Sequence, residues 1–124
     1  MTYHVKQYPP AKVVPEESNQ FPEAQVELDA AINEMRRQGP SPAGFNVKSL
    51  GAVLGGLYQL NLRVKGKQIR ILYAPYGTEI ILFHIHKKTS PQEQKAGYSV
   101  AMARKKEYER KLKEQQHAGN RTVH

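Results

Sequence analysis

Three strand-like runs, separated by turn signals, are the feature of this sequence that most limits its fold. The runs are Leu57–Lys65, Gln68–Ala74 and Glu79–His86. Each is rich in the aliphatic, β-branched and aromatic residues that favour strands. The turn-forming segments Lys65-Gly66-Lys67 and Pro75-Tyr76-Gly77-Thr78 stand between them. Because turns this short join neighbouring strands, the pattern predicts an antiparallel meander.

The residues before the meander predict a short strand, a helix and a loop. Tyr3–Tyr8 has the composition of a first strand. From about Phe21 to Gln38, apolar residues recur with helical spacing and predict a helix with one face on the core. This stripe contains Leu28, Ala31, Ile32 and Met35. Residues 40–56 hold prolines and glycines, so we expect a loop with at most one short helical turn.

The residues after the meander carry the clearest start signal of the chain. Ser90 suits a helix cap, Pro91 suits the first helical position, and Glu93 completes a capping box. The sequence therefore predicts a long, mostly polar helix from Pro91 to about Gln116. The remaining residues, 117–124, are expected to form a disordered tail.

The elements and the composition together fit one small domain. We predict an α+β fold over residues 1–116, with a small twisted antiparallel sheet formed by the N-terminal strand and the meander. An N-terminal helical segment and the C-terminal helix pack with this sheet. No stretch approaches the roughly 20 apolar residues of a membrane span, and no signal-peptide region is present. The chain has no cysteine, which excludes disulfides and thiolate zinc sites and fits a cytoplasmic protein.

The positive charge is confined to the second half of the chain. Residues 1–56 hold five Lys/Arg against six Asp/Glu, whereas residues 57–124 hold fourteen against five. A half-molecule of one sign attracts polyanions. Nucleic acid is therefore the expected partner, although an acidic protein would respond to the same field. The alternative is a cationic surface that serves only solubility.

The first predicted hairpin places two arginines on one face. If Gly66-Lys67 forms a two-residue turn, Arg63 lies directly opposite Arg70, where like charges repel. A Lys65-Gly66 turn would make the two arginines diagonal neighbours on the same face. An anion between the two guanidinium groups would replace the repulsion with charge-assisted hydrogen bonds. The alternative is that both side chains extend into water.

The third run combines an apolar set with a polar set. The apolar set is Ile81, Phe83 and Ile85, and we expect all three on the core. The polar set is His84, His86 and Lys88. A bulge at Gly77 would place the polar set on the arginine face, whereas a strict four-residue turn would reverse the faces. We predict the bulge, because burying a phenylalanine is more favourable than burying an imidazole.

These residue types suit cleavage of RNA without a metal. RNA supplies its own nucleophile, the 2′-hydroxyl, so an enzyme that aligns it needs a proton carrier and positive charge. Arg63, Arg70 and Lys88 would supply the charge, and His86 or a lysine with a lowered pKa would move the proton. The His-x-His pair has no carboxylate or cysteine nearby apart from Glu93, so we expect neither a metal nor a cofactor.

Four segments resemble the RelE/ParE superfamily of toxins, and its phage-derived, HigB-like branch in particular. They are Gly56–Arg63, Ile69–Tyr73, Ile80–Phe83 and Lys87–Thr89, and the resemblance extends over about residues 21–110. It implies a RelE-like fold and the toxin of a type II toxin–antitoxin system. Such a toxin cuts mRNA at the decoding site of the ribosome and thereby inhibits translation. The implied partner is a cognate antitoxin, often a helix-turn-helix DNA-binding protein.

The resemblance also implies roles for individual residues. It maps the arginines on either side of the hairpin turn to Arg63 and Arg70, and the basic residue after the third strand to Lys88. It maps a closing tyrosine to Tyr98. These residues, with the two histidines, are the expected catalytic set.

The chain departs from the RelE pattern on the second strand. RelE-type enzymes have lysines where this chain has Gln59 and Asn61, so we expect His84 and His86 to replace the missing base. The expected RNA-binding residues are Lys65, Lys67, Lys87, Gln59, Asn61 and Lys95. Two other functions stay open, because fold resemblance does not decide between them. One is inhibition of DNA gyrase, as in ParE-like relatives, and the other is nucleic-acid binding without catalysis.

Overall fold

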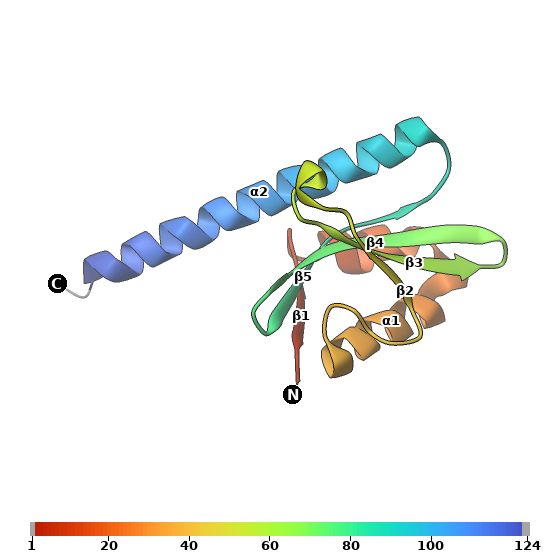
Figure 1. Cartoon of the computed structure of the whole chain (residues 1–124), viewed down its shortest axis with the longest axis horizontal. Coiled ribbons are helices and arrows are strands. Elements are labelled where there is room, and N and C mark those ends of the chain that lie inside the picture. Colours follow the sequence, from red (N-terminus) through yellow and green to blue (C-terminus); the bar gives the residue numbers. More distant parts are fainter. Residues whose placement is uncertain (1, 123–124) are drawn as a thin grey trace.

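The computed structural model describes the backbone of residues 2–122 and the side chains as far as Gln115. A five-stranded sheet forms its centre, with helices on both faces (Figure 1). The strands are β1 (His4–Gln7), β2 (Asn46–Ser49), β3 (Tyr58–Val64), β4 (Lys67–Tyr76) and β5 (Glu79–Lys87), and the helices are α1 (Gln25–Gln38) and α2 (Pro91–Thr122). The strand order is β1-β5-β4-β3-β2. The predicted α+β class, the meander and both helices are confirmed.

The two edges of the sheet differ from the prediction. β1 pairs with β5 in parallel, so the sheet is mixed and not purely antiparallel. The segment 40–56, which the sequence predicts as a loop, contains β2, and β2 pairs antiparallel with β3. Of its four residues only Val47 is apolar, so this short edge strand has no alternating pattern to recognise. The predicted short helical turn is present at Ala52–Leu54.

The first hairpin adopts the alternative register. Its turn consists of Lys65 and Gly66, whose φ values of 51° and 80° are those of a type I′ turn. Arg63 therefore lies opposite Gln68, and Arg70 lies opposite Asn61. The direct pairing of the two arginines is wrong, and they are diagonal neighbours on one face. The type I′ turn is favoured because its twist matches that of the flanking strands.

A bulge in β5 decides which side chains face α2. The turn before β5 is the pair Gly77-Thr78, and the register changes at Phe83, so the predicted bulge at Gly77 is wrong. Ile81 and Phe83 pack beneath α2, whereas Ile85 packs against α1. The expectation that all three share one core face is therefore wrong as well. Because helices cover both faces, apolar residues can be buried on either side of the sheet.

Each face of the sheet carries its own hydrophobic core. The α1 core contains the predicted helix stripe, which is fully buried and consists of Leu28, Ala31, Ile32 and Met35. The α2 core consists of Leu57, Leu72, Ala74, Ile81, Phe83 and Ala101. Tyr108 of α2 extends this second core, with its ring centroid 5.9 Å from that of Phe83. These contacts hold the first half of α2 against β4 and β5.

The start of α2 is as predicted, and its end is not. Ser90 Oγ accepts a hydrogen bond from the backbone N–H of Glu93 at 3.2 Å, as a helix cap does. The helix continues through Gln116 to Thr122, so residues 117–122 are helical where the sequence predicts a disordered tail, and residues 123–124 lie outside the described part. Within residues 2–122, neither long helix is apolar enough to cross a membrane.

Candidate nucleic-acid interface

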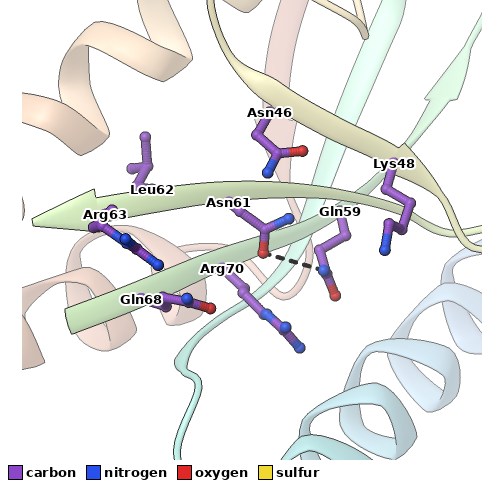
Figure 2. Close-up of a pocket in the computed structure, with 8 residues that line it drawn as sticks. All are labelled: Asn46, Lys48, Gln59, Asn61, Leu62, Arg63, Gln68 and Arg70. Carbon is purple, nitrogen blue, oxygen red and sulfur yellow. Dashed lines mark hydrogen bonds between the residues drawn. The ribbon is translucent and has the colours of Figure 1, made fainter. Parts of the chain in front are cut away.

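The α2 face of the sheet is only partly covered, and its open part forms a pocket of about 370 Å³ (Figure 2). We call it the polar pocket. Its lining residues are Asn46, Lys48, Gln59, Asn61, Leu62, Arg63, Gln68 and Arg70. Four of them have amide side chains and three are cationic, and no carboxylate is among them. Amides and cations without an acid are a combination that suits a phosphate backbone.

Strand register explains why these side chains meet. Asn46, Asn61, Arg70 and His86 lie opposite one another on four adjacent strands, so they form one row across the sheet. A second row begins with Arg63 opposite Gln68. It continues to Lys88, whose backbone N–H donates to the carbonyl of Gln68 at 2.7 Å. The three cations expected to form the site, Arg63, Arg70 and Lys88, therefore occupy neighbouring register positions.

Arg70 is the least exposed cation of the polar pocket. Only 8% of the residue is exposed, and its Nη1 donates to Gln94 Oε1 at 3.1 Å and to the Tyr98 hydroxyl at 3.0 Å. The Tyr98 hydroxyl in turn donates to Gln59 Oε1 at 2.8 Å. Arg70 Nε is buried without a hydrogen-bond partner, and no described carboxylate pairs with the guanidinium. A buried guanidinium that lacks a counter-ion is costly, and an anion in the pocket would lower that cost.

Tyr98 and Gln94 position Arg70 from α2. The sequence assigns Tyr98 to the site, and the structure places its hydroxyl between the pocket residues Arg70 and Gln59. Gln94 is not among the predicted residues, although it precedes Tyr98 by one helical turn and therefore faces the same way. The spacing of four residues between Gln94 and Tyr98 is the feature of the sequence that could have assigned Gln94 to the site.

The other predicted RNA-binding lysines lie outside the polar pocket. Lys65 is exposed in the hairpin turn, and Lys67 pairs with Glu23 at 3.1 Å. Lys87 lies opposite Ile69, whose side chain belongs to the α1 core, so its register places it on the α1 face. Lys95 is exposed on α2. The predicted Gln59 and Asn61 do line the pocket.

Two lining residues escaped the sequence-based prediction because they belong to β2. Asn46 lies opposite Asn61, and Lys48 lies opposite Gln59. Both extend the polar surface toward the sheet edge, as Figure 2 shows. No apolar alternation marks β2 as a strand, so nothing in the sequence indicates that these two side chains share a face with Arg70.

His86 is beside Arg70 in the sheet, but α2 covers it. Burial lowers the pKa of His86 to about 4, helped by the nearby His84 and Arg70, so its imidazole is neutral near pH 7. Both ring nitrogens are buried without hydrogen-bond partners. The ring stacks on His84 with a centroid distance of 5.3 Å, and the centroid of the Tyr98 ring lies 6.2 Å away in an edge-on arrangement. In this arrangement the ring nitrogens of His86 are buried, and His86 is not among the residues that line the polar pocket.

The covering of His86 depends on Gly97. A Cβ atom on Gly97 would lie 2.9 Å from His86 Nδ1, closer than atoms pack. We expect Gly97→Ala to lower the free energy of unfolding, because overpacking costs about 1–3 kcal/mol and better helix propensity returns only about 1 kcal/mol. In a His86→Ala background the clash is absent, so Gly97→Ala should stabilise the protein. Urea denaturation of the wild type, the two single variants and the double variant measures the effect of Gly97→Ala in each background. Destabilisation by Gly97→Ala in both backgrounds would contradict the contact.

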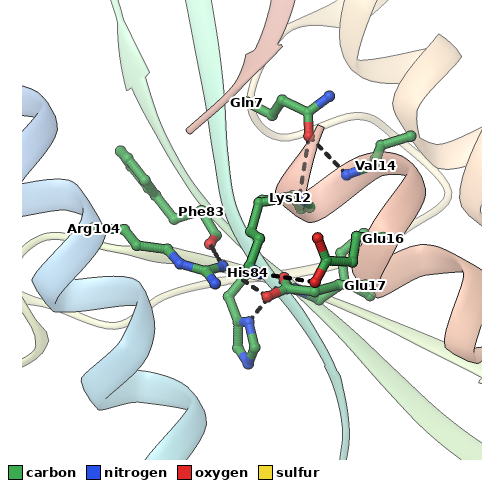
Figure 3. A network of polar contacts seen from close by, with 10 residues as sticks. Gln7, Lys12, Val14, Glu16, Glu17, Phe83, His84 and Arg104 are labelled. Carbon is green, nitrogen blue, oxygen red and sulfur yellow. Dashed lines mark hydrogen bonds and ion pairs between the residues drawn. The ribbon is translucent and has the colours of Figure 1, made fainter. Parts of the chain in front are cut away.

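His84 belongs to a separate network that is centred on Glu17 (Figure 3). Glu17 Oε1 lies 2.9 Å from His84 Nδ1 and accepts from the backbone N–H of Ile85 at 3.1 Å. Arg104 of α2 donates to Glu17 Oε2 at 2.8 Å and to the carbonyl of Phe83 at 2.7 Å. The network therefore joins the N-terminal segment, β5 and α2. The ring of His84 contacts Glu17 within this network and has a structural role there.

The fold and the polar pocket define a small α+β protein with a cation-rich pocket on one face of its sheet. The family model of the phage-derived Gp49-like proteins (DUF891) matches residues 16–106. The chain therefore belongs to this family, which is known from toxin–antitoxin contexts. Membership is compatible with a toxin-like role and with an antitoxin partner. Comparison with curated proteins and with solved structures gives no match. The matched residues include the whole lining of the polar pocket.

Proposed function

We propose that this protein is the toxin of a toxin–antitoxin system and acts as an endoribonuclease on mRNA. The observation that carries the proposal is Arg70, a buried guanidinium without a carboxylate partner, at the inner edge of a pocket lined by amides and cations. Family membership and the resemblance to RelE-type toxins support the same function. The proposed reaction needs no metal, because RNA carries its own nucleophile and the arginines of the polar pocket supply positive charge.

The proposed reaction uses the nucleophile that RNA carries. The 2′-hydroxyl oxygen bonds to the adjacent phosphorus and the bond from phosphorus to the 5′-oxygen breaks, which leaves a 2′,3′-cyclic phosphate and a 5′-hydroxyl end. Arg70 and Arg63 would stabilise the charge on the phosphoryl oxygens in the transition state. Because His86 is covered, the proposed rate enhancement comes mainly from alignment and charge, with water exchanging the protons.

The lining of the polar pocket is our reason for proposing ribosome dependence. Its lining includes no aromatic side chain on which unpaired bases could stack, so a free, flexible RNA strand would bind it weakly. On the ribosome an mRNA strand is already ordered, so most of the entropy of alignment has been lost beforehand. We therefore propose that the natural substrate is mRNA held on a translating ribosome.

Primer extension on mRNA incubated with the purified protein tests this function. We expect cuts in codon register when ribosomes are present and few or none without them. The fragments should carry cyclic phosphate and 5′-hydroxyl ends. Intact mRNA together with inhibited gyrase supercoiling would overturn the proposal in favour of a ParE-like inhibitor.

A further inference from the structure

The second half of α2 projects from the body of the protein. The described contacts of α2 with the sheet and its N-terminal segment begin at Gln94 and reach Glu109, whose carboxylate accepts from the Tyr76 hydroxyl at 2.7 Å, and Lys111, which lies 5.2 Å from the ring of Tyr8. The C-terminal part of α2 extends past the sheet, as Figure 1 shows. A helix that continues so far beyond its own core gains little from burial there. Its surface is therefore available for a contact with another molecule.

One face of α2 carries most of the available charge. At 100° per residue, five exposed residues between positions 95 and 113 align on the side away from the sheet. We call them the outer stripe, and they are Lys95, Ser99, Lys106, Arg110 and Lys113. At a rise of about 1.5 Å per residue the stripe is roughly 27 Å long. It contains four cations and no acidic residue.

The cations on the other sides of α2 already have partners. Lys105 pairs with Glu109 at 2.6 Å, and Lys111 lies 3.8 Å from Glu107. In the outer stripe only Arg110 has an ion pair, an exposed one with Glu114. Among the described side chains, Lys106 and Lys113 have none. The stripe therefore keeps a positive potential that intramolecular pairing does not cancel.

The composition of the outer stripe identifies its ligand. It has no large apolar side chain, which protein interfaces use as anchors and membrane-surface helices need for insertion. It also has no aromatic side chain, which single-stranded RNA would use for base stacking. A straight line of cations fits the phosphates of a regular helix, because duplex RNA is recognised by shape and backbone.

We propose that the outer stripe of α2 binds the phosphate backbone of double-stranded RNA, as a second site separate from the polar pocket. The inference rests on the proposed function in taking RNA as the polyanion. Structured RNA of the ribosome is rich in such duplex, so the stripe would anchor the protein while the pocket engages mRNA. Contact with phosphate alone gives affinity without sequence preference.

Fluorescence anisotropy with a labelled, 2′-O-methylated RNA duplex tests the stripe without any cleavage. We expect the triple variant Lys106→Gln/Arg110→Gln/Lys113→Gln to bind at least about tenfold more weakly at low salt. Removing three phosphate contacts should also reduce the slope of log K against log salt by about 2 to 3. The matched control, Lys12→Gln/Arg36→Gln/Arg37→Gln, removes the same charge elsewhere and should keep the slope of the wild type.

Three outcomes would overturn the proposal. Equal losses in both triple variants would mean that affinity follows net charge and not the stripe. Equal competition by single-stranded RNA would remove the preference for a duplex. If the triple variant lost as much affinity for polyglutamate as for duplex RNA, the ligand of the stripe would be an acidic protein.

An Arg70 variant separates this site from the polar pocket. It should no longer cleave mRNA but should bind the duplex normally.

Discussion

Replacement of Arg70 by alanine should reduce mRNA cleavage by about 10²- to 10³-fold, the usual loss when one donor to transition-state charge is removed. The expectation follows from its position, buried at the edge of the polar pocket and held by Gln94 and Tyr98. Arg70→Lys keeps the charge but loses the planar fork, so it should retain only part of the activity. Primer extension with ribosomes measures the rate, and growth inhibition on expression provides a second readout.

The controls for this prediction separate chemistry from folding. Arg37→Ala removes an arginine from the solvent side of α1, where its side chain is 70% exposed, and should leave cleavage unchanged. Gln94→Ala should act through Arg70 and lower the rate less than Arg70→Ala does. Thermal melting shows whether each variant is folded. A folded Arg70→Ala protein that cleaves at the wild-type rate would remove Arg70 from the mechanism.

Replacement of Glu17 by alanine should lower the free energy of unfolding by about 3–5 kcal/mol, because breaking a buried ion pair leaves its partners uncompensated. Glu17 is 7% exposed, and without it the backbone N–H of Ile85 loses this acceptor and Arg104 keeps only the carbonyl of Phe83. The neighbouring Glu16 is the matched control, since its pair with Lys12 is exposed and Glu16→Ala should change stability by less than about 1 kcal/mol. Urea denaturation measures both variants, and equal effects would contradict the network.

The same contact predicts a dependence on pH. Burial by itself would raise the pKa of Glu17, but hydrogen bonds from His84, Ile85 and Arg104 and the charge of His84 hold it below its ordinary value. A carboxyl group with a lowered folded-state pKa stabilises the protein above the unfolded-state pKa of about 4.5. That contribution is lost as the pH falls through the folded-state pKa. The stability difference between wild type and Glu17→Ala should therefore be constant near neutrality and shrink below about pH 4.5.

Much of the fold follows from local patterns in the sequence. The three meander strands alternate or run apolar within clear turn signals, and α1 shows its buried stripe directly, with Leu28 and Met35 as members. The capping residues of α2 determine where that helix starts. These features are predictable because the periodicity and the caps act over a few residues. The sequence does not predict β2, because a single apolar residue, Val47, cannot show the alternation of apolar and polar residues that marks a strand.

The candidate site was predictable in part. Arg63, Arg70 and Lys88 were expected on one face, and the register places them in adjacent rows. The expected catalytic use of the histidines does not follow from the structure, because His84 binds Glu17 and α2 covers His86. Neither contact has a local signal, since Glu17 and Gly97 are distant from the histidines in sequence. Catalytic roles for all these residues stay predictions.

The sequence by itself determined the three meander strands, the start of α2 and the concentration of positive charge in the second half of the chain. Tertiary structure alone decided the register in which these cations meet, because that depends on the hairpin turn at Lys65-Gly66 and on the bulge at Phe83. It also decided that Arg70 is buried, because α2 crosses the sheet at Gln94 and Tyr98. The physical reason is that register and helix docking minimise the free energy of the whole core, whereas sequence patterns report only on neighbours along the chain.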